Sequence, residues 1–312
     1  PAPATCSLRA TVLDLTPLLD FATVWESEDT PAAPGPEVEP DPVELPLRQL
    51  TAELQVQRLY LRDLVLRDWT ARAELRNGQI SIQPCTLRVD DAPVSATLRL
   101  DLTRPGYAYE FGLDASGVHL RPLVDTFAPE YAGQIQGDLL ARLQFSGAGI
   151  TGPSLQRHLR GQAALDTTNL NFQVVTPRAK KLLTALATAL RLEALATSPL
   201  NTLSARLDIA DGQVHVRPFT AGSAAFWATA EGVIRLAPVL TNSPVDLPVQ
   251  LALRADLARQ IKLAQLTPSS RTNFLNLPPL VKIKGTLGSP ETEIDKLRLA
   301  CLLYTSPSPR DS

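Results

Sequence analysis

Residues 74–102 read ELRNGQISIQPCTLRVDDAPVSATLRLDL, and residues 208–236 read DIADGQVHVRPFTAGSAAFWATAEGVIRL, so the two stretches align without a gap. Each opens on a two-residue turn, Asn77-Gly78 or Asp211-Gly212, of the kind that joins adjacent antiparallel strands. Each then passes through a proline step into two more strand-like segments. The alignment predicts an internal repeat of a β-meander, and a sheet built from repeated units tends to be elongated.

A two-residue turn also fixes which residues face each other across the strands. The turns predict that Leu75 faces Ile80 in the first hairpin. In the second, Ile209 faces Val214 and Leu207 faces Val216. All of these side chains are apolar, and a register shift of one residue would move them to the other face. We therefore predict that six residues share the covered or concave side of one sheet: Leu75, Ile80, Leu207, Ile209, Val214 and Val216.

Apolar residues recur at every second position through residues 50–56, 107–115, 135–145, 245–253 and 281–287. This spacing places alternate side chains on one face of a strand. It predicts a mainly β fold, an elongated, curled antiparallel sheet of repeated meander units with one or two amphipathic helices. Six further residues are candidates for its apolar surface: Ile135, Leu139, Leu143, Phe145, Val249 and Leu251.

Residues 177–196 depart from the strand pattern, because a proline at a possible first helical position precedes leucines at helical spacing. This predicts an amphipathic helix, which either caps the sheet or lies on a membrane surface and gates lipid. Residues 31–46, PAAPGPEVEPDPVELP, predict an exposed and irregular linker, because proline and acidic residues form neither ladder nor helix.

The expected organisation follows from these boundaries. Residues 1–30 form an N-terminal strand and turn, residues 31–46 the linker, and residues 47–300 the repeated β region. Residues 301–312, CLLYTSPSPRDS, resemble a translated sequencing adapter and are expected to make few contacts. The sequence contains no methionine and begins with Pro1, so we expect it to be a piece of a longer protein, with any membrane anchor upstream.

Composition argues against several classes of function. The formal net charge of -2 gives no basic footprint for nucleic acid. Three dispersed cysteines and three dispersed histidines fit no metal-ligand spacing, and the serines and glycines form no nucleophile elbow or phosphate loop. We therefore expect no enzyme activity, metal or cofactor, although carboxylates that meet only in space stay open. The thiols are expected to be isolated, with a Cys6–Cys85 bridge as the alternative.

Several segments resemble the AsmA family over most of residues 8–299. Besides the two hairpins, they are GVHLRPLVDTFAPEYAGQIQGDL at residues 117–139, FSGAGITGPSLQRHLRGQAAL at residues 145–165, and LPPLVKIKGTLGSPETEIDK at residues 277–296, the most specific. Such proteins are similar to bridge-like lipid-transfer proteins. The resemblance implies an inner-membrane helix followed by a periplasmic, curled sheet with an apolar concave face.

The resemblance therefore predicts a non-enzymatic periplasmic protein of the Gram-negative cell envelope, anchored in the inner membrane in its intact form. Its apolar β-groove would handle phospholipid or another acyl-chain lipid between the inner and outer membranes, and so support outer-membrane biogenesis. One alternative is a scaffold that binds envelope proteins through its sheet edges and assists outer-membrane protein assembly. A cell-envelope hydrolase is the third possibility.

Overall fold

The computed structural model of the protein describes residues 4–17, 38–62, 64–173, 184, 187–188, 192–260, 266–269, 271–295 and 297–298. Within these residues the chain forms one sheet of 16 strands. The strands are β1 (Ala4–Asp14), β2 (Gln49–Leu61), β3 (Leu64–Arg76), β4 (Gln79–Val89), β5 (Ala92–Asp101), β6 (Ala108–His119), β7 (Ile135–Ala148), β8 (Arg160–Phe172), β9 (Leu200–Ala210), β10 (Gln213–Ser223), β11 (Phe226–Arg235), β12 (Pro244–Arg254), β13 (Thr267–Pro268), β14 (Phe274–Asn276), β15 (Val281–Thr286) and β16 (Ser289–Ile294).

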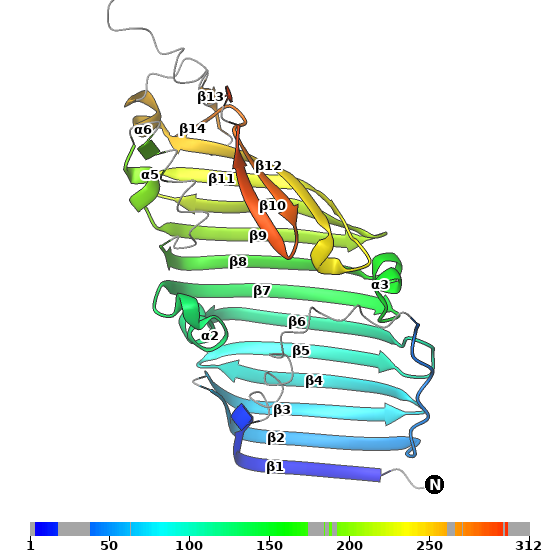
Figure 1. The fold of residues 1–312 in the computed structure, drawn as a ribbon. Coiled ribbons are helices and arrows are strands. Elements are labelled where there is room, and N and C mark those ends of the chain that lie inside the picture. The colour runs from blue at the N-terminus through cyan, green and yellow to red at the C-terminus, as the bar shows by residue number, and fades with distance from the viewer. Residues whose placement is uncertain are drawn as a thin grey trace, which may run out of the picture.

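Strands β1 to β12 follow one another in space in the order of the sequence, so the sheet is a long, open and curled meander (Figure 1). All neighbours from β2 to β12 are antiparallel, which confirms the predicted mainly β fold. The prediction of a wholly antiparallel sheet is wrong at one place, because β1 and β2 run parallel. Residues 15–48 join them, a connection long enough to return the chain to the same end of the sheet.

The two sequence repeats fold alike. Their turn residues have positive φ, 50° at Asn77 and 80° at Gly78, against 51° at Asp211 and 73° at Gly212, as a tight hairpin turn requires. Each hairpin then has an irregularity at the aligned position in the strand after the turn, residues 82–85 of β4 and residues 216–219 of β10. The internal repeat of the β-meander is therefore present in the structure.

Both hairpins also have the predicted register. Leu75 lies opposite Ile80 in the first hairpin. In the second, Val214 lies opposite Ile209, and Val216 lies opposite Leu207. The turn sequences alone were enough to predict which residues pair.

Short helices lie at the ends of the strands. They are α2 (Leu120–Phe127), α3 (Gly152–His158), α5 (Ala194–Thr197) and α6 (Ala255–Gln260), together with the 3-10 turns η1 (Pro129–Tyr131) and η2 (Leu240–Asn242). Most of the helix predicted at residues 177–196 lies outside the described residues. Its end is helical as α5, where Leu192 and Leu195 are buried in a hydrophobic cluster. Residues 301–312 also lie outside.

The C-terminal part of the sheet folds over itself. The second half of β12 pairs with β11, whereas its first half, residues 244–249, pairs with β15. In Figure 1 the β15–β16 hairpin crosses in front of the strands around β10 and β12. Ile283 of β15 packs with Leu247 of β12 against a cluster that contains Val216. This end of the apolar face is therefore covered by protein.

Candidate functional site: the apolar face of the sheet

Two rows of apolar side chains cross the sheet on one face. Consecutive members of each row are paired directly across neighbouring strands. The first row runs from β1 to β10 through Leu8, Leu54, Ala71, Cys85, Ala96, Leu113, Leu143, Ala163, Leu207 and Val216. The second runs from β1 to β11 through Cys6, Ala52, Ala73, Ile82, Leu98, Phe111, Phe145, Gly161, Ile209, Val214 and Ile234.

The other face is polar over the same strands. One of its rows contains Arg9, Gln55, Thr70, Thr86, Ser95, Asp114, Arg142, Ala164 and Arg206. Its ion pairs include Arg142–Asp114 at 2.9 Å and Arg99–Glu110 at 3.3 Å. Because these pairs are solvent-exposed, each adds little to stability. What distinguishes the two faces is that one has no charged residue in its rows.

Exposure divides the apolar face into two parts. On β1 to β7 every member of the two rows is half-buried or exposed, with Leu8 at 52% and Phe111 at 36%. On β10 and β11, Val214, Val216 and Ile234 are buried. We call the β1–β7 part the open half and the β9–β12 part the covered half. The two rows of the open half present apolar surface, whereas a separate buried cluster on the same face, which contains Val89, Ala115 and Ala141, lies beside them and is packed by Leu123 of α2.

The structure places the predicted candidate residues in three settings. Leu75, Ile80, Leu143, Phe145, Leu207 and Ile209 are half-buried. Val214, Val216, Val249 and Leu251 are buried in clusters of the covered half. Ile135 packs against the border of one of these clusters, whereas Leu139 packs against the separate buried cluster on β3 to β7 that contains Ala115 and Ala141.

Several members of the open half escaped the sequence interpretation. Leu54 and Leu113 belong to the period-two segments recognised at residues 50–56 and 107–115 but were not among the candidate residues, and Leu98 lies in the same rows outside those segments. Two polar atoms also lie in this half. The indole nitrogen of Trp69 and the hydroxyl of Tyr109 are buried and have no hydrogen-bond partner within the described parts of the chain. Both atoms can donate a hydrogen bond. That they are buried and unpaired is visible only in the folded structure and not in the sequence.

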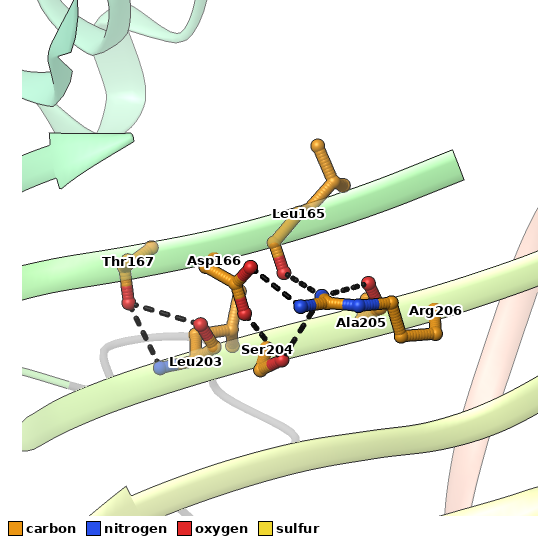
Figure 2. A network of polar contacts seen from close by, with 7 residues as sticks. All are labelled: Leu165, Asp166, Thr167, Leu203, Ser204, Ala205 and Arg206. Atoms are coloured by element: carbon orange, nitrogen blue, oxygen red, sulfur yellow. Dashed lines mark hydrogen bonds and ion pairs between the residues drawn. The ribbon is translucent and has the colours of Figure 1, made fainter. Parts of the chain in front are cut away.

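The boundary between the two halves lies at β8 and β9, where the ladder is interrupted between the Asp166–Ser204 pair and the Phe172–Leu200 pair. Figure 2 shows how side chains replace the missing backbone bonds. The Thr167 hydroxyl accepts from the Leu203 amide at 2.8 Å and donates to the Leu203 carbonyl at 3.1 Å. One side chain thus satisfies both backbone groups of Leu203.

On the polar face, Arg206 of β9 bridges to β8 beside the same interruption of the ladder (Figure 2). Its guanidinium donates to Asp166 at 2.6 Å and to the Leu165 carbonyl at 3.1 Å. The hydrogen bond from Arg206 is the main cause that lowers the pKa of Asp166 below its ordinary value, and a bond from Ser204 adds to it. The network keeps β8 and β9 together where their backbones diverge.

A second polar contact anchors the linker to the sheet. The Glu39 carboxylate accepts hydrogen bonds from the Ile150 amide at 2.9 Å and from the Thr151 amide at 3.2 Å, and also from the Thr151 hydroxyl. Hydrogen bonds from the Ser154 and Thr151 side chains lower its pKa to about 2. Residues 38–46 contain no helix or strand, yet Glu39 ties them to the start of α3.

Among the described residues, the His119–Asp138 cluster lies at strand ends and is not enclosed. His119 contacts Asp138 at 2.7 Å, and Asn169 donates to the same carboxylate at 2.9 Å; hydrogen bonds from Asn169 and then His119 lower the pKa of Asp138. The His119 side chain is 59% exposed, as expected for a polar cluster at strand ends. The described residues contain no group of three or more metal-binding side chains. Cys6 and Cys85 are free thiols.

None of the helices in the described residues is long and apolar enough to span a membrane. No family model, curated protein or solved structure matches the chain.

Proposed function

We propose that the open half of the apolar face binds the acyl chains of phospholipid, and that the protein handles lipid in the cell envelope without catalysis. The observation that carries the proposal is the pair of uninterrupted apolar rows from β1 to β7, whose members are all half-buried or exposed. A water-soluble sheet would ordinarily keep one face polar and cover the other. An apolar ligand would supply the missing cover.

The dimensions suit a long apolar ligand. Neighbouring strands lie about 4.8 Å apart, so the open half, which spans the seven strands β1 to β7, extends about 29 Å along the sheet. Each methylene group removed from water contributes about 0.8 kcal/mol, so about ten buried methylenes contribute about 8 kcal/mol. Such binding needs continuous aliphatic surface and few polar contacts.

Two donors could fix the polar end of the ligand. The Trp69 indole nitrogen and the Tyr109 hydroxyl belong to the apolar face, because Trp69 is opposite Val56 and Tyr109 is opposite Leu100. Ester carbonyls of a phospholipid accept hydrogen bonds and adjoin the acyl chains. Both atoms are covered by protein in the lipid-free structure, so donation to a lipid ester requires the side chains above them to move, and it would then satisfy donors that are costly to leave unpaired.

The proposal is tested by site-specific photo-crosslinking in phospholipid vesicles. A benzophenone side chain is placed at Leu98, Leu113 or Leu143 on the apolar face. The matched controls are Thr97 and Gln144, which neighbour these residues in β5 and β7 but point to the polar face. We expect lipid adducts, identified by mass spectrometry, at the first three positions and none at the controls.

Equal capture on both faces, or no capture at any apolar position, would contradict the proposal. Capture of a specific protein at the apolar positions without lipid would instead favour the scaffold alternative. The periplasmic location and the inner-membrane anchor rest only on the resemblance to the AsmA family, and they are part of the proposal.

A further inference from the structure

The polar face of the sheet carries charged residues in cross-strand positions. Glu53 of β2 lies directly opposite Arg72 of β3, and Arg99 of β5 lies directly opposite Glu110 of β6. The charged groups of these two pairs are 3.9 Å and 3.3 Å apart. Opposite charges in such positions stabilise a sheet, whereas like charges directly opposite each other destabilise it.

Three arginines on the same face break this rule. Arg58 of β2 lies directly opposite Arg67 of β3, which in turn lies directly opposite Arg88 of β4. Arg88 stands between Leu87 and Val89, whose side chains belong to a hydrophobic cluster on the apolar face, so the three arginines point to the polar face. All three are exposed. We call Arg58, Arg67 and Arg88 the arginine row.

The protein neutralises the arginine row only in part. The Asp91 carboxylate, in the turn after β4, lies 3.7 Å from Arg67, and its side chain is 89% exposed. Arg88 donates to the Asp91 backbone carbonyl at 2.9 Å, a contact that supplies no negative charge. No other carboxylate of the described residues, including Asp68 and Asp90 beside the row, forms an ion pair with it. Three guanidinium groups therefore share one carboxylate.

We propose that the arginine row is an anion site that binds a phosphate group. The planar guanidinium group presents paired N–H donors that match phosphate oxygens, and a bound anion would relieve the repulsion between the arginines. Neighbouring strands lie about 4.8 Å apart, so Arg58 and Arg88 are about 10 Å apart on either side of Arg67, and their long side chains can converge above it. The phosphate group belongs either to a lipid headgroup or to a soluble compound.

The arginine row is separate from the surface proposed to bind acyl chains, because the two lie on opposite faces of the sheet. A lipid whose acyl chains lie on the apolar face cannot place its phosphate on the row, since the sheet stands between them. A headgroup bound by the row would therefore belong to a different lipid, such as one in a membrane surface. The anion site does not depend on the proposed lipid-handling function.

Calorimetric titration of the whole chain with inorganic phosphate tests the site. We expect phosphate to bind, and Arg67→Gln to raise the dissociation constant at least about tenfold, because it removes the central charge-assisted hydrogen bonds. Arg99→Gln is the matched control, since it removes an exposed arginine of the same face outside the row. It should change the phosphate affinity by less than about twofold, as expected for an exposed charge away from the site.

Thermal unfolding without phosphate tests the repulsion within the row. At low ionic strength, we expect Arg67→Gln to raise the melting temperature above that of the parent protein, because it separates two like charges that face a third. Arg99→Gln removes an ion pair with Glu110 and should not raise it. A lower melting temperature for Arg67→Gln would show that the arginines do not repel one another, and would count against the proposal.

Vesicle flotation separates the two sources of phosphate. Vesicles of phosphatidylcholine carry no net charge, whereas vesicles that also contain phosphatidic acid present anionic phosphate. Acyl-chain binding on the apolar face would occur with both, so only the difference between them reports on the arginine row. Stronger binding to the anionic vesicles that Arg67→Gln abolishes and Arg99→Gln preserves would assign the phosphate to a lipid headgroup.

Binding of inorganic phosphate without a difference between the two kinds of vesicle would assign the site to a soluble phosphate compound. Absence of binding in both assays, or an equal loss in Arg67→Gln and Arg99→Gln, would overturn the proposal.

Discussion

The two repeats of the sheet have the same fold and different surroundings. Ile80 and Ile82 of the first correspond to Val214 and Val216 of the second, by the gapless alignment of residues 74–102 with residues 208–236. The first two are half-buried, whereas the valines are 8% and 7% exposed. A β-meander of this kind therefore does not determine by itself whether its apolar face is covered.

One substitution between the repeats lies at the point where β12 packs over the second repeat. Leu98 of the first repeat corresponds to Gly232 of the second. A Cβ atom at Gly232 would come within 2.5 Å of the Leu247 side chain, so Leu247 packs directly over the strand where a side chain is missing. In the first repeat, Leu98 occupies this space. The missing side chain at Gly232 thus leaves space for Leu247 in the second repeat, whereas the Leu98 side chain fills the equivalent space in the first.

The largest expected effect compares the equivalent positions Val216 and Ile82. Val216→Asp buries an unpaired charge in a packed cluster, so we expect it to lower the free energy of unfolding by more than about 4 kcal/mol. Ile82→Asp leaves the charge partly in water and should cost about 1–2 kcal/mol. Urea unfolding of lipid-free protein measures both. Similar losses at the two positions would show that the open half is covered in solution.

A smaller effect is expected where the two halves meet. Thr167→Val removes the hydroxyl that serves both backbone groups of Leu203 (Figure 2), and we expect a loss of about 2 kcal/mol. Hydrogen exchange of the Leu203 amide should become faster. Thr168→Val, at an exposed neighbouring position, is the matched control and should change stability by less than about 0.5 kcal/mol. An unchanged exchange rate of the Leu203 amide would mean that the Thr167 hydroxyl does not stabilise β8 and β9 where their ladder is interrupted.

The sequence predicts most of what local chemistry determines. The Asn77-Gly78 turn was sufficient to pair Leu75 with Ile80, because turn geometry fixes register without reference to the rest of the chain. The parallel direction of β1 was not predictable, because it depends on where a long connection returns. The fold of β12 over Gly232 also escaped prediction, since a glycine in a strand does not identify the side chain that will approach it.

For the candidate face, the sequence predicted which residues belong to it but not which of them are covered. Period two identified Leu143 and Phe145 as members of one apolar face, and it equally identified Val249 and Leu251. Periodicity reports which face is apolar and not what lies over it. The distinction between open and covered residues therefore required the path of β12 and β15, which is set by long-range contacts.

The last residues of the two repeats are hydrogen-bonded to different partners. The smallest expected change in stability concerns Glu39, which connects these partners. The Leu102 carbonyl that ends the first repeat accepts from the Val43 amide of the linker at 3.0 Å. The equivalent Leu236 carbonyl accepts from the Gln156 side chain of α3 at 2.6 Å. Glu39 connects the two arrangements, because it ties the linker to the start of α3.

Glu39→Gln should therefore lower the free energy of unfolding by about 1 kcal/mol at pH 7, since a neutral amide accepts the hydrogen bonds of Ile150 and Thr151 more weakly than a carboxylate. The pKa of Glu39, about 2, lies below the ordinary value of 4.5, so its contribution is complete above pH 4.5 and is lost as the pH falls through 2. The difference in urea midpoint between the variant and the parent protein should accordingly shrink from pH 7 to pH 2. Asp41→Asn, in the same segment but exposed, is the control and should give almost no difference at either pH. A Glu39→Gln difference that persists unchanged at pH 2 would contradict the role assigned to the charge, because about half of the Glu39 carboxyl groups are then protonated and most of the charge-dependent stabilisation is lost.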